Sequence, residues 1–414
     1  MSRNPTDLSD TLEKGNPAST NFANRSTVYI IAFALALSGC AELASLFFIQ
    51  PLLPKLANEY TVPVTQVSII LSAETALLAF GLLFMGSLSD RFGRKQLIVV
   101  ALLVGGVLTI LCPLATSWIE LVALRGLIGL CLSGIAAAAT AYIDEEVAPS
   151  LAGIVTGYFV FGNSFGGMSG RVLASQVMNI VPLSTIFFLS GAILIAVGIF
   201  VSAFLPSSCN FSASKSISFV TMVRSGMNQF KNFNVSLVFI VSFVIFGTFS
   251  ALYNFLAFHL HDDPFNVSNA QAGLVSTCFL LSVITAPGAG KLAAKYGAMN
   301  VLAFLLGIMA VAILLTAWAT TAWVFISGAV IFTAAFFGCH AIGFGWVSKN
   351  AFHDKGQATA LYLFFYYMGG SVVGYLAGLV FGRFGWTGLS ACILALLIGA
   401  IGVTRIVQRR MSTV

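Results

Sequence analysis

The stretch Gly86-Ser-Leu-Ser-Asp90-Arg91-Phe-Gly93-Arg94-Lys95 decides the fold of this 414-residue chain. It lies between two apolar runs, residues 67–85 and 97–115, and each run has about the 20 residues that a helix needs to cross the hydrocarbon of a bilayer. A short basic turn that contains an Asp cannot lie in lipid, so it must face water. Its excess of Arg and Lys predicts that it lies on the cytoplasmic side.

The whole chain has the composition of an integral membrane protein. Hydrophobic residues make up 58% of it and charged residues only 8%, against about 25% charged residues in soluble domains. The formal charge of +6 fits basic loops that face an anionic leaflet and does not suggest a nucleic-acid partner. The seven Cys residues are scattered and lack the spacing of metal ligands. We therefore expect a lipid-embedded chain with no metal and no other cofactor.

Apolar segments recur along the chain with short polar breaks between them, and they predict twelve transmembrane helices. An even number of spans places both termini on the same side of the membrane. The predicted spans are residues 28–48, 67–85, 97–115, 119–142, 154–176, 183–205, 235–260, 272–289, 301–318, 323–347, 358–381 and 386–406.

The distribution of basic residues predicts on which side of the membrane the two termini lie. Sixteen of the 20 Lys and Arg residues fall on the side of the termini. The opposite side carries only Lys55 and Arg383, while Arg125 and Arg171 fall inside spans. By the positive-inside rule both termini are cytoplasmic. The polar segment at the start of the chain lacks the apolar core of a signal peptide, and we expect a bacterial inner (plasma) membrane location.

The second half of the chain repeats the first half at an offset of 204 residues. The segment Gly290-Lys-Leu-Ala-Ala-Lys295-Tyr-Gly297 follows the eighth span as Gly86 to Gly93 follows the second. Such a repeat predicts two parallel six-helix halves. We expect an N-terminal tail (1–26), a first six-helix bundle (27–205), a linker (206–234), a second bundle (235–406) and a C-terminal tail (407–414).

The pattern Gly-x-Leu-x-Asp-Arg-x-Gly-Arg-Lys resembles the signature loop of the major facilitator superfamily, which joins the second and third helices of that family. The resemblance implies an all-α integral membrane fold, with twelve transmembrane helices in two pseudo-symmetric bundles. It also implies that Asp90 lies at the contact between the halves. Salt bridges from this loop to the acidic end of the fourth span would form a cytoplasmic gate, the alternative being a solvated helix end. The expected gate residues are Gly86, Asp90, Arg91, Gly93, Arg94 and Asp144.

Three charged residues inside the first half are predicted to couple transport to protons: Glu42, Glu74 and Arg125. A charge inside a span is costly unless it is paired or hydrated. A carboxylate whose hydration or Arg partner changes can take up and release a proton. The run Arg125-Gly126-Leu-Ile-Gly129 resembles the Arg-x-x-x-Gly motif of helix four in the family, which is linked to proton handling. The alternatives are a fixed Glu–Arg pair that holds helices together and an Arg125 that snorkels to the interface.

The fifth span contains Gly162, Gly166 and Gly170, four residues apart on one helical face. This spacing lets another helix approach closely, so it predicts a packing seam or hinge. The segment resembles the Gly-Pro-x-x-Gly-Gly motif of helix five, a mark of antiporters and exporters. Asn163 stands where that motif has Pro, and this departure keeps an importer among the alternatives.

Several polar and aromatic side chains inside spans are predicted to line a substrate cavity. His340 is the only His well inside a span, and a His can titrate near neutral pH. Aromatic residues are common in spans, and this chain has 37 Phe, so plain packing is the alternative reading. The predicted cavity residues are Arg171, Asn163, Tyr253, Asn254, His340, Tyr362 and Tyr366.

The resemblance is greatest to the twelve-helix drug:proton antiporter group. It implies a proton-coupled transporter that exports a small organic solute or drug. One alternative is a proton-coupled importer of a nutrient, organic acid or siderophore-like compound, in which Arg125 and Arg171 bind an anionic substrate. Another is a membrane sensor or assembly protein, against which the intramembrane charges argue. We expect no enzymatic activity, and a monomer whose partners are its small-molecule substrate, protons and the lipid bilayer.

Overall fold

The computed structural model describes residues 25–208, 224, 226–351 and 355–412. Within these ranges every regular element is a helix. Most of the predicted N-terminal tail, most of the predicted linker and the last two residues of the C-terminal tail lie outside the described ranges. The all-α membrane fold predicted from the sequence is confirmed for the part of the chain that the structure covers.

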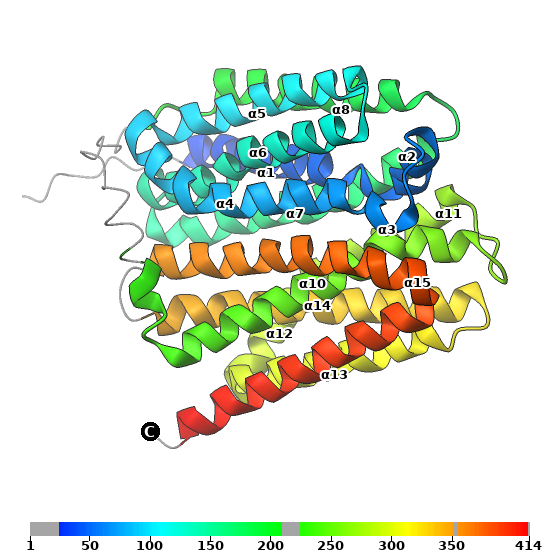
Figure 1. Ribbon diagram of the computed structural model, residues 1–414. Coiled ribbons are helices and arrows are strands. Elements are labelled where there is room, and N and C mark those ends of the chain that lie inside the picture. Colours follow the sequence, from blue (N-terminus) through cyan, green and yellow to red (C-terminus); the bar gives the residue numbers. More distant parts are fainter. Residues whose placement is uncertain (1–24, 209–223, 225, 352–354, 413–414) are drawn as a thin grey trace, which may run out of the picture.

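Six long helices form the first bundle, and two short helices follow α1 on one side of it (Figure 1). The short ones are α2 (Leu53–Glu59), which follows the 3₁₀ turn η2 (Gln50–Leu52), and α3 (Val64–Val67). The long helices are α1 (Arg25–Phe47), α4 (Ile69–Phe92), α5 (Arg94–Leu111), α6 (Trp118–Glu146), α7 (Pro149–Val177) and α8 (Leu183–Phe204).

The second bundle contains fewer labelled helices but the same number of spans. One span is a helical run of three pieces, α11 (Asn269–Leu274), the 3₁₀ helix η4 (Val275–Leu281) and α12 (Ser282–Tyr296). The last element, α15 (Lys355–Ser412), holds two spans, because Gly385 breaks the helix with a φ of 61°. The other spans are α10 (Phe233–His261), α13 (Ala298–Ala317) and α14 (Ala322–Asn350).

Ten segments of the described chain are long and apolar enough to cross a membrane. One of them, Lys355–Met411, has 57 residues and contains the break at Gly385, so it accounts for two spans. Helix α7 is not among the ten, although its 29 residues are long enough, because Gly, Ser and Asn dilute its apolar residues. Each of the twelve predicted spans therefore coincides with a helix or a helical run.

The signature stretch is not the loop that the sequence suggested. Residues 86–92 continue helix α4, and the turn consists of Gly93 alone, which has a φ of 99°. A helix can extend past the lipid where its side chains are polar, and Gly is the residue that tolerates this backbone angle. Asp144 lies two residues beyond the predicted end of the fourth span, and it is likewise helical, in the last turn of α6.

The internal repeat predicted from the sequence is present in the helix boundaries. Helices α6 and α14 begin at Trp118 and Ala322 and end at Glu146 and Asn350, so both pairs of ends are 204 residues apart. The turn at Gly93 has its counterpart at Gly297, which also has a positive φ, 88°. The two halves are therefore built on one six-helix plan.

Helices α1 and α7 pack at unusually close range along the predicted glycine seam. A methyl group added to Gly162, Gly166 or Gly170 would overlap backbone atoms of Ala36, Cys40 or Ala44, respectively. Only glycine permits this approach, so the predicted packing role of the seam is confirmed. The seam fixes the side of α7 that carries Arg171.

The two bundles meet through α4 and α3 against α15, and through α7 against α11 and η4. In Figure 1 helix α1 begins and α15 ends on the left, which we call the terminal side, and α2, α3 and α11 lie on the right, the distal side. Several of the contacts between bundles lie toward the distal side. Ser371 donates a hydrogen bond to the Ser72 carbonyl over 2.7 Å, and Gly378 packs on Thr65 and Ser68.

Candidate functional site

A fully buried ion pair lies in the middle of the first bundle. Arg125 on α6 donates from Nη2 to Glu74 Oε2 on α4 over 2.6 Å, and from Nε to the same oxygen over 3.1 Å. Neither side chain has any solvent-exposed surface. The structure thus assigns Glu74, and not Glu42, as the partner of Arg125.

The guanidinium of Arg125 also bonds to the end of α1, while its Nη1 has no hydrogen-bond partner among the described residues. Nη2 also donates to the Ser45 carbonyl over 2.8 Å, and the charge lies 5.1 Å from the centre of the Phe48 ring. An arginine that snorkelled to the interface would be exposed at its tip, so this alternative is wrong. The pair joins α1, α4 and α6 into one unit. A buried oxygen of Glu74, Oε1, has no hydrogen-bond partner within the described residues.

Glu42 on α1 is buried without a cation. Its side chain is 2% exposed, and no Lys, Arg or His of the described chain lies within salt-bridge distance. Its Oε2 atom also lacks a hydrogen-bond partner among the described residues. The phenol of Tyr367 on α15, in the second bundle, lies near enough to interact electrostatically with Glu42. Glu42 therefore lies where the two bundles face each other.

Arg171 on α7 is the second arginine that is buried inside a span, and its guanidinium is bonded differently. Its Nε donates to Gln50 Oε1 over 2.5 Å and its Nη1 to the Gly167 carbonyl over 2.6 Å. The residue is 2% exposed, and its Nη2 has no hydrogen-bond partner in the described structure. Within that structure no carboxylate lies in salt-bridge range of Arg171. Its positive charge is thus balanced only by dipoles and rings.

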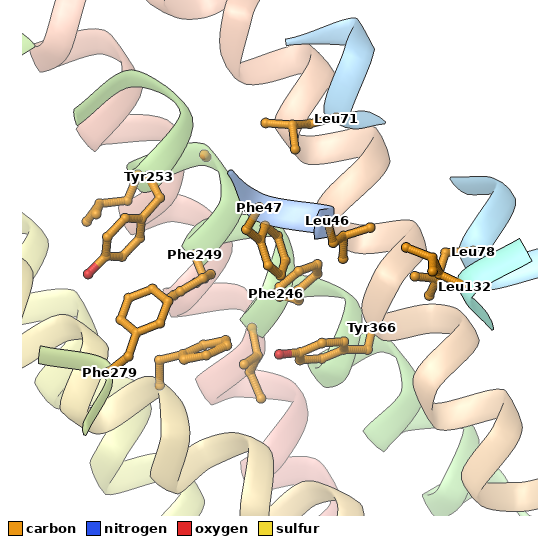
Figure 2. Packing of buried hydrophobic residues seen from close by; sticks show 14 of the residues in the cluster. Leu46, Phe47, Leu71, Leu78, Leu132, Phe246, Phe249, Tyr253, Phe279 and Tyr366 are labelled. Atoms are coloured by element: carbon orange, nitrogen blue, oxygen red, sulfur yellow. The ribbon is translucent and has the colours of Figure 1, made fainter. Parts of the chain in front are cut away.

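Three aromatic rings surround the guanidinium of Arg171. Its central carbon lies 4.0 Å from the ring centre of Phe47, 4.7 Å from Phe279 and 5.7 Å from Tyr253. Phe47 belongs to the first bundle, and the other two rings belong to the second. Figure 2 shows these rings where the bundles meet, with Phe47 next to the ring of Phe246 on α10. Such rings stabilise a cation that has lost its water.

Gln50 links the two bundles and was missed by the sequence reasoning. Its Nε2 donates to Asn254 Oδ1 on α10 over 2.5 Å, while its Oε1 accepts from Arg171. Gln50 and Asn254 are 204 residues apart, which is the repeat offset. That offset was available in the sequence and could have paired the two amides. Two residues predicted to line the cavity, Arg171 and Asn254, are therefore linked by hydrogen bonds to the same side chain, Gln50.

The other predicted cavity residues fall into two groups of the second bundle. Tyr362 lies 3.3 Å from His340 through its hydroxyl and Nδ1, and the His340 ring lies 4.5 Å from that of Tyr366. Tyr366 in turn stacks on Phe246, with ring centres 4.2 Å apart. Tyr253 is bonded to Thr333 over 2.7 Å. Asn163, by contrast, lies against Gly39 of α1, inside the glycine seam.

The predicted gate residues lie at the terminal-side ends of α4, α5 and α6. Arg94 forms an ion pair with Asp90, and donates from Nη2 to Glu145 Oε1 over 2.6 Å. These pairs connect three helices of the first bundle. Asp144, the expected partner, is exposed, and its neighbour Glu145 takes that place. A methyl group on Gly86 would meet nothing within 4 Å, and Arg91 is exposed beside Phe92.

Comparison with known proteins places this geometry among membrane transporters. The family model described as Major Facilitator Superfamily matches residues 35–263 and 235–411. An uncharacterized transporter of Buchnera aphidicola subsp. Schizaphis graminum is 36% identical over 90% of this chain and 89% of its own length. Inner membrane transport protein YnfM of Escherichia coli K12 is 36% identical over 97% of each chain.

Solved structures show the same fold. A bacterial homolog of the human lysosomal transporter Spinster, in an inward-facing and occupied conformation, superposes with a TM-score of 0.76. The match covers 94% of this chain and 98% of the other, at 14% identity. The relatives and the fold are those of transporters and not of enzymes.

Proposed function

Because this chain belongs to the Major Facilitator Superfamily, we propose that it is a proton-coupled secondary transporter that exports a small organic solute by alternating access. In this mechanism the two bundles rock about a central site and expose it to each side in turn. We place both termini in the cytoplasm of a bacterial cell and the protein in its inner membrane. The charge distribution of the loops supports this orientation.

The observation that carries the proposal is the burial of Glu42, near Tyr367 of the second bundle and without a cation among the described residues. An ionised carboxylate is costly to bury alone, so a group that alternates between this environment and water gains and loses a proton. Rocking of the bundles supplies that alternation. Glu42 is therefore our first proton carrier.

The Glu74–Arg125 pair is the second element of the proton path. In the present arrangement Arg125 and Glu74 neutralise each other, and the Ser45 carbonyl at the end of α1 accepts a further hydrogen bond from Arg125. A shift of α1 relative to α4 would weaken the hold on Arg125 and change the surroundings of Glu74. We infer that α1 transmits the state of Glu42 to this pair, since it carries Glu42 and the Ser45 carbonyl.

The ion pairs of Arg94 with Asp90 and Glu145 are assigned to the latch of the cytoplasmic side. They hold the ends of α4, α5 and α6 as one surface. A rigid surface at this place can meet the second bundle as a unit when the cytoplasmic side closes. The exposed residues Arg91 and Asp144 lie at the same end and are the side chains free to reach across.

The test is proton release from purified protein in detergent, measured with a panel of cationic, neutral and anionic solutes. If solute and proton exchange for each other, a solute that binds should release protons from the wild-type protein. Glu42→Gln should abolish this release while keeping the fold. Glu74→Gln tests the second carrier in the same assay. Solute binding with no proton movement, in wild type and both variants, would rule out proton coupling through these residues.

A second candidate function, import of an anionic solute together with protons, is favoured by one observation. Arg171 is a buried cation without an acidic partner in the described structure. A bound anion would lower the cost of protonating a nearby carboxyl group, so an anion and a proton would bind together. In the proton assay, co-transport predicts that the protein takes up protons when the anion binds. Proton exchange predicts that the protein releases protons when the solute binds.

A further inference from the structure

The proposed transport function does not say which chemical class of solute is carried. The surroundings of Arg171 indicate one class. We propose that Arg171 binds the carboxylate of a small aromatic acid, at a site between α7, the end of α1 and the second bundle. The inference rests on the proposed transport function and concerns which solute is carried. Three features support it: the charge balance of Arg171, its free donors and the rings around it.

The charge balance distinguishes Arg171 from Arg125. Both side chains are almost fully buried, but Arg125 is neutralised by Glu74, and Arg171 has no carboxylate in salt-bridge range among the residues described. A buried cation without a counter-charge is costly. A bound anion would remove that cost. We therefore assign Arg125 to the ion pair within the first bundle and Arg171 to the binding of an anion.

The two donors that an anion could use lie on one edge of the guanidinium. Nη1 is fixed by the Gly167 carbonyl, Nη2 has no partner, and Nε is held by the neutral amide of Gln50. A carboxylate binds arginine best through two parallel hydrogen bonds. The edge formed by Nε and Nη2 offers these bonds once Gln50 moves aside. The anion thus competes with Gln50 for Arg171.

The rings select what is attached to the carboxylate. Phe47, Tyr253 and Phe279 lie within 6 Å of the guanidinium carbon, measured to the ring centres. A flat aromatic ring on the ligand can stack among them, whereas a hydrated or bulky polar group cannot. Two of these rings come from the second bundle, so the site opens when the bundles separate on the distal side.

Displacement of Gln50 would also affect the contact between the bundles. The amide that bonds Arg171 is the same one that bonds Asn254 of α10. An anion that takes its place at Arg171 frees this side chain and weakens the bridge. Ligand binding and opening of the distal side are therefore linked through one residue.

The experiment is calorimetric binding to the full-length protein in detergent at neutral pH, with benzoate, benzamide and acetate as probes. Benzamide keeps the ring without the charge, and acetate keeps the carboxylate without the ring. We expect benzoate to bind at least about tenfold more tightly than either, because it alone satisfies both halves of the site. Equal binding of benzamide, or of acetate, would overturn the proposal.

Variants assign the binding to Arg171. Arg171→Gln should weaken benzoate binding at least about tenfold, and Arg171→Lys should restore part of it, because a lysine keeps the charge but not the paired donors. Gln50→Ala should tighten binding by removing the competing acceptor. The matched control is Arg383→Gln, an exposed arginine that also stacks on a ring, Phe384. Unchanged benzoate binding in a folded Arg171→Gln protein would show a purely structural role.

The same samples separate failure of the site from failure of the transport mechanism. Proton movement with cationic or neutral solutes only, and no benzoate binding, would refute the site and leave proton coupling intact. Benzoate binding that depends on Arg171, with no proton movement for any solute, would support the site and refute the coupling.

Discussion

At the scale of single residues, the fully buried charged side chains of the described chain all belong to the first half. Glu42, Glu74, Arg125 and Arg171 all lie in the first bundle, and their counterparts at the repeat offset are Phe246, Cys278, Ala329 and Tyr375. The counterpart of Glu42, Phe246, is stacked on Tyr366 at the centre of the aromatic cluster. The same position thus carries an acid in one half and a ring in the other.

The buried Glu74–Arg125 pair gives the first prediction at this scale. Glu74→Gln or Arg125→Gln alone should destabilise the protein by about 3–5 kcal/mol, because each leaves one buried charge without its partner. The double variant should lose much less than the sum of the two single losses. Thermal unfolding in detergent measures all three.

Glu42→Gln is the matched control for that measurement. It makes the same carboxyl-to-amide change at a residue that is equally buried but has no cation beside it. We expect its unfolding temperature to stay close to that of wild type. Additive losses in the double variant, or a loss at Glu42 as large as at Glu74, would show that the ion pair does not contribute as a pair.

The sequence could identify the charged residues inside the spans, but it could not predict which of them pair with each other. Charge inside an apolar span is visible in one dimension, and so Glu74, Arg125 and Arg171 were expected to matter. Pairing depends on how helices rotate against each other, and Glu74 and Arg125 are 51 residues apart. Gln50 escaped notice because a neutral amide near the end of a span has little cost in its own right. Its importance comes from two partners, 121 and 204 residues away.

At the scale of helices, the close packing of α1 on α7 is the feature with the clearest consequence. Gly166→Ala should destabilise the protein by about 1–3 kcal/mol, because the added methyl group has no room beside the Cys40 carbonyl. The control is Gly153→Ala on the same helix, where an added methyl meets nothing within 4 Å. That change should be neutral or stabilise α7 by about 0.5–1 kcal/mol. Unfolding temperatures that fall equally in both variants would contradict a specific seam.

The positions of the helices were predictable because apolar runs in the sequence mark the segments that lie in the lipid bilayer. Helix ends were less so. The apolar run of the second span stops at Met85, but α4 continues to Phe92, since polar residues such as Ser89 and Asp90 remain helical in water. The stop comes from backbone conformation, at Gly93, and not from hydropathy. Gly385 similarly marks the break between the last two spans with a positive φ.

At the scale of the whole molecule, contacts between the bundles predict a lock that can be engineered. The Cβ of a residue at position 378 would lie 3.0 Å from Ser68 Oγ, within reach of a disulfide between α15 and the start of α4. The same Cβ would lie 2.7 Å from the Thr65 carbonyl oxygen, so α3 must shift slightly to admit it. In a background free of other cysteines, oxidised Ser68→Cys/Gly378→Cys should hold the distal side shut and stop transport. Reduction should restore it, as measured by solute flux in proteoliposomes.

A pair inside one bundle provides the control for this lock. The Cβ at position 370 would lie 3.0 Å from Ser250 Oγ, so Ser250→Cys/Gly370→Cys joins α10 to α15 at the same distance. This Cβ would lie 2.4 Å from the Phe246 ring, which must move aside, so the pair also controls for the steric cost of an added Cβ. Rigid-body rocking leaves this distance unchanged, and transport should continue after oxidation. Full activity of the oxidised 68/378 pair would be incompatible with rocking of the two bundles about their distal contact.

The bond between Gln50 and Asn254 joins a position to its own counterpart in the other repeat. In a duplicated chain, such a contact descends from one in which two copies of the same residue met across a two-fold axis. A residue on that axis must be able to bond to itself. An amide can, because it carries both a donor and an acceptor, whereas two carboxylates or two guanidinium groups would repel each other. Self-complementarity at the axis explains why the bridge is a pair of neutral amides, whereas Arg171, which bonds to one end of this bridge, occurs in the first half only.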